Sequence, residues 1–179
     1  SKSVTPFLNV LSPKDFNPGS LKQVPIIDSA LKNTNTELLS KKAIEIAKKD
    51  WDSFETSWDF QSFPFLSDGL KKTSVAASYT AWERQCRDNI QIMQALEEEN
   101  NRLFIDAYGL QDELTPEVPE EQITLAHPGQ TEDIKRLVSY AIGCMMGRYS
   151  LDKPGLVYAH AGNDSFDPIL YPSFPADED

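Results

Sequence analysis

Apolar residues in the first half of the chain recur at helical spacing rather than strand spacing. From Thr36 to Trp58 they follow one another at steps of three or four residues, and lysines fall largely on the opposite side. Thr36 is a suitable N-cap, and Glu37 places an acid in the first turn. The pattern predicts a first helix over Thr36–Trp58. Its inward stripe is Leu39, Ala43, Ala47, Trp51, Phe54 and Trp58.

A longer ladder follows, with steps that alternate between four and three residues for more than four heptads. It predicts a second helix over Ser74–Ala107, with a coiled-coil-like seam. Gly109 is a suitable stop just after it. Because the linker between the two helices is short and aromatic, we expect them to form an antiparallel pair. The seam is Val75, Tyr79, Trp82, Cys86, Asn89, Met93, Leu96, Asn100, Leu103 and Ala107, and its two asparagines could fix register by pairing across the interface.

A third helix is predicted from Thr131 to about Tyr149, with Pro154 and Gly155 beyond its end. It contains the run Cys144, Met145, Met146, which is suggestive of a metal or redox site. Consecutive residues point about 100° apart around a helix, so these sulfurs cannot converge on one ion, and we interpret the segment as a core helix. Gly143 and Gly147 are expected to leave a strip for close approach by another helix or backbone. The predicted buried stripe is Ile134, Leu137, Val138, Ala141, Met145 and Tyr149.

These patterns predict a mainly α fold: an antiparallel pair of long helices, a third packed helix, and irregular or short-stranded ends. Residues 1–29 would form the extended end of an upstream domain, with a strand near Val24–Ile27. Residues 30–149 would form a helical spacer domain, and 150–179 an acidic, loop-rich tail that leads to a further domain. The proline-bearing acidic connector from Leu110 to Gln130 shows little periodicity and is expected to be a loop.

The charge of the chain is unevenly distributed. The net charge is −11, and residues 97–133 alone carry 11 acids against Arg102. Most of this surface would repel a duplex, because phosphate binding needs clustered lysine and arginine. No run of about 18 apolar residues and no signal segment is present, which predicts a cytoplasmic protein without membrane contact. Cys86 and Cys144 are the two cysteines, and we expect both to be buried and reduced.

Motifs that would indicate catalysis are missing or weak. None of the eight glycines forms a GxGxxG turn, and no NPPY tetrapeptide is present. The acid-x-lysine fragment at Glu132–Lys135 is better explained by helix capping than by a nuclease site. His127 and His160 have no zinc-ligand partners at the required spacing, and the run Asp164–Asp167 lacks the glycine of a calcium loop. Glu97–Glu99 is interpreted as a solvated helix face. The aromatic residues of the linker region, expected to pack rather than to stack bases, are Trp51, Phe54, Trp58, Phe60, Phe63 and Phe65.

Several long segments resemble a known family. KKDWDSFETSWDF (48–60), EEENNRLFIDAYGLQDELTPEVP (97–119) and IKRLVSYAIGCMMGRYSLDKPGLVYA (134–159) are similar to the region beyond the catalytic core of adenine-specific DNA methyltransferases. Those enzymes belong to BREX phage-defence systems and to related single-chain restriction-modification systems. The opening segment LNVLSPKDFNPGSLKQVPII is also similar, with Gly19-Ser20 in place of the family's Gly-Asp step. The likeness covers about three-quarters of the chain.

The resemblance implies that the chain is a piece of a larger enzyme that methylates adenine N6 with S-adenosylmethionine. No catalytic, cofactor-binding or metal-binding residue can be assigned here, so the expected role is a helical spacer between catalysis and DNA recognition. Two alternatives stay open: an interaction module that docks other defence proteins through Glu97–Asp133 and the tail, and an acidic DNA mimic. DNA would be bound through the parent protein. The candidate backbone contacts within this chain are Lys41, Lys42, Lys48, Lys49, Lys71 and Lys72.

Overall fold

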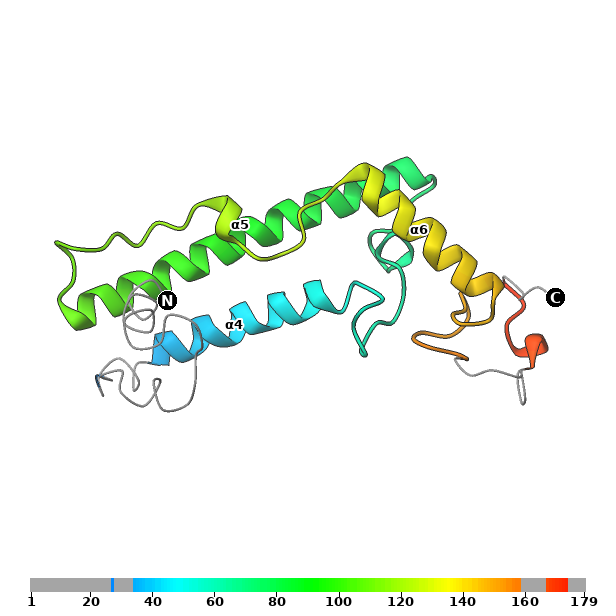
Figure 1. The fold of residues 1–179 in the computed structure, drawn as a ribbon, viewed down its shortest axis with the longest axis horizontal. Coiled ribbons are helices and arrows are strands. Elements are labelled where there is room, and N and C mark those ends of the chain that lie inside the picture. The colour runs from blue at the N-terminus through cyan, green and yellow to red at the C-terminus, as the bar shows by residue number, and fades with distance from the viewer. Residues whose placement is uncertain (1–26, 28–33, 159–166, 174–179) are drawn as a thin grey trace, which may run out of the picture. The chain divides into compact units, whose positions relative to one another are not determined.

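The computed structural model describes residue 27, residues 34–158 and residues 167–173 (Figure 1). The α-helices among these residues are α4 (Thr34–Trp51), α5 (Val75–Tyr108) and α6 (Gln130–Met145). Single 3₁₀ turns lie at Pro64–Leu66, Glu120–Gln122 and Pro168–Leu170. Within these residues there is no strand, so the prediction of a mainly α fold is confirmed. The strand expected near Val24–Ile27 lies outside the described residues except for Ile27, which is not in a strand.

Two compact units make up the chain. Unit 1 contains residues 1–47 and 89–124, and unit 2 contains residues 48–88 and 125–179. The boundary therefore falls within both long helices, after Ala47 in α4 and after Asp88 in α5. Within unit 1 the chain runs in opposite directions along α4 and α5, as expected for an antiparallel pair (Figure 1). No helix among the described residues combines the length and the apolar composition needed to cross a bilayer.

Helix α4 ends seven residues earlier than predicted. After Trp51 the chain continues in single turns, with Phe54 N–H donating to the Trp51 carbonyl at 3.2 Å. Serine and aspartate side chains compete with the backbone here and disfavour helix: the Ser57 hydroxyl donates to Asp52 at 2.6 Å and accepts from the Asp59 N–H at 3.1 Å. The predicted inward stripe is wrong for Ala47, Trp51 and Trp58, which are exposed, and no residue of α4 is fully buried.

Helix α5 matches its predicted bounds within one residue. The Ser74 hydroxyl accepts a hydrogen bond from the Ala77 N–H at 3.2 Å, which caps the N-terminus. At the other end Gly109 has a φ of 66°, and the Leu110 N–H donates to the Ile105 carbonyl at 3.0 Å. This bond across six residues, with glycine in the left-handed region, is a Schellman C-cap. The helix has 34 residues and is therefore about 50 Å long at 1.5 Å per residue.

The buried stripe of α5 departs from the predicted ladder along the helix. Trp82, Cys86 and Met93 are buried as expected, but Asn101 and Ile105 are buried in place of the next ladder positions. Val75 at the start of the ladder is 52% exposed, and Ile90 is buried beside the ladder position Asn89. A strict seven-residue repeat also drifts by about 20° per heptad on a straight α-helix. The expected asparagine pairing is wrong for Asn100, whose buried side-chain oxygen has no hydrogen-bond partner among the described residues.

The connector after α5 is mostly irregular, as expected, but it also contributes to the core of unit 1. Val118 and Ile123 are buried, and Ile123 is only 2% exposed. Three hydrogen bonds join the connector to α5. Gln94 Nε2 donates to the Val118 carbonyl at 2.7 Å, Val118 N–H donates to Glu98 at 3.1 Å, and Asn101 Nδ2 donates to the Pro116 carbonyl at 3.2 Å. The prediction that Glu97–Glu99 form a solvated helix face is therefore wrong for Glu98, which bonds to the connector.

Helix α6 begins one residue before the predicted start and ends at Met145. Asp133 is buried, and its carboxylate accepts a hydrogen bond from the Gly129 N–H at 3.1 Å at the N-terminus of the helix. The residues buried on α6 are Asp133, Tyr140, Gly143 and Cys144. The predicted stripe is wrong for Val138 and Met145, which are exposed, whereas Tyr149 is buried but lies beyond the helix.

Candidate functional site

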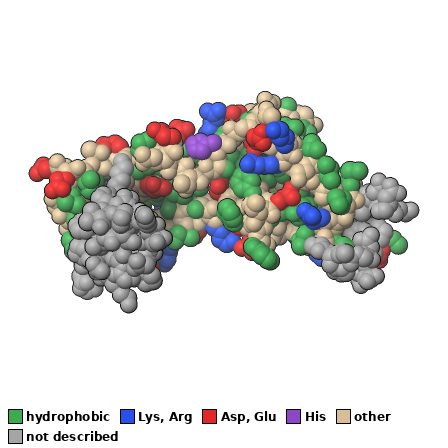
Figure 2. All heavy atoms as spheres, in the orientation of Figure 1, with side chains coloured by type: hydrophobic (Ala, Val, Ile, Leu, Met, Phe, Trp, Pro, Cys, Tyr) green, Lys and Arg blue, Asp and Glu red, His purple; other side chains and the backbone are tan. Residues whose placement is uncertain are grey.

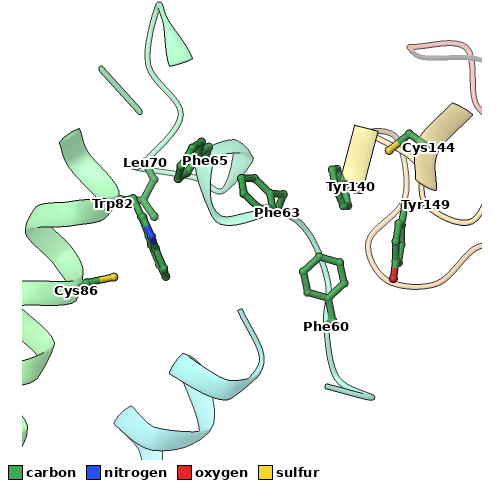
Figure 3. Close-up of a cluster of buried hydrophobic side chains, with 9 residues drawn as sticks. All are labelled: Phe60, Phe63, Phe65, Leu70, Trp82, Cys86, Tyr140, Cys144 and Tyr149. Carbon is green, nitrogen blue, oxygen red and sulfur yellow. The ribbon is translucent and has the colours of Figure 1, made fainter. Parts of the chain in front are cut away.

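An aromatic cluster forms the core of unit 2. Figure 3 shows Phe60 and Phe63 between the α5 side chains, Trp82 and Cys86, and the tyrosines at and beyond α6. The rings of Tyr140 and Tyr149 stack at 5.2 Å between centroids, and Phe60 meets Tyr149 edge-on at 5.4 Å. Such pairs stabilise by ~0.5–1.5 kcal/mol beyond the area they bury. The buried members are Phe60, Phe63, Phe65, Leu70, Trp82, Cys86, Tyr140, Cys144 and Tyr149.

Two glycines bring Tyr149 into this cluster. Gly147 has a φ of 71°, a conformation that residues with a side chain rarely adopt, and it turns the chain back after α6. The Arg148 N–H then donates to the Gly143 carbonyl at 2.8 Å. A Cβ on Gly143 would lie 2.8 Å from the Tyr149 ring, so the missing side chain makes room for that ring. The expected Gly143–Gly147 strip thus receives Tyr149 of the same chain, not another helix.

A surface cavity of about 300 Å³ opens beside the cluster within unit 2. Phe54, Phe60 and Phe63 supply its apolar wall, and Arg136 stands at its edge with the guanidinium carbon 4.6 Å from the Phe54 ring centroid. Arg136 also pairs with the buried Asp133 at 3.0 Å. The guanidinium is held by two partners, so it forms part of the wall. The polar residues around the cavity are Ser53, Glu55, Thr56 and Ser139.

A second cavity of about 220 Å³ shares Glu55, Thr56 and Phe60 with the first. Tyr149 and Trp58 also line it, and the Trp58 side chain is fully exposed. The linker aromatics therefore divide into two groups. Phe60, together with Phe63 and Phe65, packs in the core as predicted, whereas Trp51 and Trp58 face solvent.

The thiols of unit 2 are poor nucleophiles. Burial raises the pKa of Cys86 to about 12, and the charges of Asp50 and Asp133 add to the rise. Burial also raises the pKa of Cys144, partly offset by a hydrogen bond with Tyr140. Cys144 is buried while Met145 and Met146 are exposed, so the three sulfur side chains do not converge.

Among the described residues, no group of three or more histidine, cysteine, aspartate or glutamate side chains is arranged to hold a metal ion. The acid-x-lysine fragment lies in the first turn of α6, where Lys135 pairs with Glu132 at 2.6 Å. Of the other candidates, His127 is exposed. His160 and the start of Asp164–Asp167 lie outside the described residues.

The six candidate lysines are exposed, but three of them already have partners. Lys41 pairs with Glu37 at 2.6 Å. Lys48 contacts Asp52 and Asp59 at 2.7 and 2.5 Å, and these hydrogen bonds raise the pKa of Lys48 to about 12. Lys72 donates to the Gly69 carbonyl at 2.6 Å. DNA contact by these residues stays a prediction.

The remaining three, Lys42, Lys49 and Lys71, form no ion pair with the described residues. Lys49 lines a surface cavity of about 310 Å³ that also contains Asp52, Asp59 and Asp68. These carboxylates make the surroundings of Lys49 unfavourable for a phosphate. The structure therefore does not gather the lysines into one basic patch within unit 2.

Comparison with known proteins identifies relatives along the whole chain. No family model matches it. It is 37% identical over 183 residues to the adenine-specific methyltransferase PglX of Lacticaseibacillus casei (strain Zhang), an alignment that covers all of this chain. It is 35% identical over 187 residues to the adenine-specific methyltransferase BrxX of Escherichia coli O9:H4 (strain HS), which covers 92% of this chain.

The chain spans only 15% of the length of each of these curated relatives. The resemblance drawn from the segments 48–60, 97–119 and 134–159 is confirmed by these alignments. The chain is therefore a homologue of one segment of the adenine-specific methyltransferases PglX and BrxX.

Proposed function

We propose that this chain is a non-catalytic helical spacer within an adenine-specific DNA methyltransferase of a BREX or restriction-modification system. It would hold the DNA-recognition part of that enzyme in position relative to the catalytic part. S-adenosylmethionine would be bound by the catalytic part, outside this chain. The observation that carries the proposal is the similarity, over 92% and 100% of this chain, to two methyltransferases of which it covers 15%.

The construction of α5 supports a positioning role. The helix is continuous for 34 residues, and buried side chains anchor it at intervals: Trp82 and Cys86 in unit 2, Met93 and Ile105 in unit 1. Packing of an apolar face supplies most of the stability of a helix in a folded protein, and α5 has such packing in each unit. Rigidity matters because a target base must be flipped out of the duplex into a catalytic pocket. A misplacement of about 1 Å can cost on the order of a hundredfold in rate.

A helix-breaking substitution in the complete methyltransferase tests the proposal. Gln91 is exposed in the middle of α5, so Gln91→Pro removes a backbone hydrogen bond without emptying the core. A proline there costs about 3 kcal/mol and kinks the helix. We expect adenine methylation to fall at least about tenfold while S-adenosylmethionine affinity, measured by calorimetry, is unchanged.

Gln91→Ala is the matched control and should keep full activity, since alanine favours helix. Unaltered methylation by a folded Gln91→Pro enzyme would contradict the spacer role. A second measurement uses the 179-residue chain alone. Titration with S-adenosylmethionine should give no binding heat, and micromolar affinity would show that the chain itself holds the methyl donor.

A further inference from the structure

Helix α6 carries a second apolar face opposite its core face. Tyr140 and Cys144 are each 2% exposed and face the aromatic cluster of unit 2. At 100° per residue, Val138, Ile142 and Met145 fall within about 60° of one another on the other side of the helix. They are 54%, 49% and 44% exposed, and Met146 just beyond the helix is 72% exposed. These four residues are called the outer face of α6.

An outer face of this kind is unusual for a helix at the surface of a folded unit. Such helices normally carry charged or polar residues opposite the core. Figure 2 shows hydrophobic side chains at the surface over α6. Contiguous apolar surface of a few hundred Å² on a single chain is often functional. The helix is apolar on both sides, as is expected of an element that packs between two partners.

The helical stretch that carries the outer face has a positive charge. No acid occurs between Ile134 and Tyr149, and Lys135, one helical turn before Val138, is exposed. The pair that Lys135 makes with Glu132 joins two side chains that are about two-thirds exposed, so it competes weakly with another partner. A complementary surface would therefore combine apolar side chains with acidic residues at its edge.

We propose that the outer face of α6 binds the apolar side of an amphipathic, acid-edged helix from the remainder of the methyltransferase polypeptide. The proposal rests on the proposed function and specifies one contact within it. The relatives are much longer than this chain, which covers 15% of each, so such a helix would be tethered at high effective concentration.

A second copy of this chain is a less favourable partner for the outer face, because the apolar area is small. Four large side chains at about half exposure offer on the order of a few hundred Å², whereas a stable dimer buries ~800 Å² on each partner. An interface between domains of one polypeptide is sufficient at a smaller area. The outer face is thus suited to a tethered neighbour.

Methionine oxidation measures this contact directly, because two of the three methionines lie on the outer face. Met145 and Met146 are exposed, and Met93 is 5% exposed in the core, which provides an internal reference. In the 179-residue chain alone, hydrogen peroxide should oxidise the outer-face methionines roughly tenfold faster than Met93. In the complete methyltransferase, we expect their oxidation to slow at least about fivefold while Met93 is unchanged. Equal rates in the two proteins would overturn the proposal.

A double variant tests whether the protection comes from this face. Val138→Lys with Ile142→Lys should restore fast oxidation of Met145 and Met146 in the complete enzyme. The matched control is Ile92→Lys, which places lysine at a half-exposed isoleucine on α5 and should leave the protection intact. Circular dichroism of both variants must show unchanged helix content. Protection that survives the double variant would overturn the proposal.

Two further outcomes are distinguishable. Protection that appears in the 179-residue chain alone and rises with its concentration would mean that a second copy occupies the face, which overturns the proposal. If Met145 and Met146 are protected in the complete enzyme but methylation survives Gln91→Pro, the spacer role fails and the docking contact stands.

Discussion

At Gly143 an added side chain would have almost no space. Its hydrogen atom faces the Tyr149 ring, which is itself buried between Tyr140 and Phe60. Gly143→Ala would gain up to about 1 kcal/mol of helix propensity. It would also place a Cβ 2.8 Å from a ring atom that is held on two sides. We expect a net loss of about 1–2 kcal/mol in the free energy of unfolding, measured by urea denaturation.

Gly129→Ala is the control for that substitution. Gly129 has a φ of −142°, and a Cβ there meets no atom within 4 Å, so its effect should be a few tenths of a kcal/mol. If Gly143→Ala were as stable as the natural chain, the Tyr149 ring would have room to move, and the close packing described for the cluster would be wrong.

The two thiols give a prediction that depends on pH. A pKa of about 12 for Cys86 lowers its thiolate fraction at pH 8 roughly a thousandfold relative to a thiol with a pKa near 9. Because the pKa values of both cysteines are raised, reactivity with Ellman's reagent should stay slow at pH 8 in the folded chain. In 8 M urea both thiols should react at once. Fast labelling of the folded chain would mean that unit 2 opens readily.

At the scale of elements, the connector after α5 differs most from what its sequence predicts, because part of it packs in the core of unit 1. Ile123 is 2% exposed although the surrounding sequence, PEVPEEQITLAHPG, is acidic and rich in proline. Ile123→Ala should lower the free energy of unfolding by about 2–4 kcal/mol, because it leaves a cavity in the core of unit 1. Ile44→Ala is the control: Ile44 is 65% exposed on α4, so its truncation should have little effect. Equal small effects would mean that the connector does not pack on α5.

Helix α5 shows how far a sequence pattern can be used at this scale. The positions of its ends follow from local chemistry, Ser74 as a cap and Gly109 as a stop, and both were predictable. The face that it buries depends on which elements lie beside it. Trp82 and Cys86 meet the aromatic cluster of unit 2, whereas Asn101 bonds to the connector at Pro116. A single repeating pattern read from the sequence assumes the same packing partner along the whole helix, whereas α5 packs against different segments along its length.

At the scale of the whole molecule, the charge distribution predicts weak interaction with DNA. The chain carries −11, and Lys41, Lys48 and Lys72 already have partners. We expect no band shift of a duplex by this chain at about 150 mM salt, because few phosphate charges would be neutralised. A shift that weakens with salt and disappears when Lys42, Lys49 and Lys71 are changed to glutamine would show that this segment contacts the backbone after all.

The sequence by itself determined the helical character of residues 34–158, the ends of α5, and the relationship to adenine-specific methyltransferases. These properties depend on local spacing, on capping residues and on long similar segments, all of which can be read along one chain. Only the tertiary structure decided which faces are buried: Tyr140 and Cys144 rather than Val138 and Met145 on α6, and Ile123 in a segment without periodicity. Burial of a face depends on which segment packs against it. When a helix is apolar on two sides, its sequence does not show which side meets the core. The same holds for an irregular segment with a single buried apolar residue.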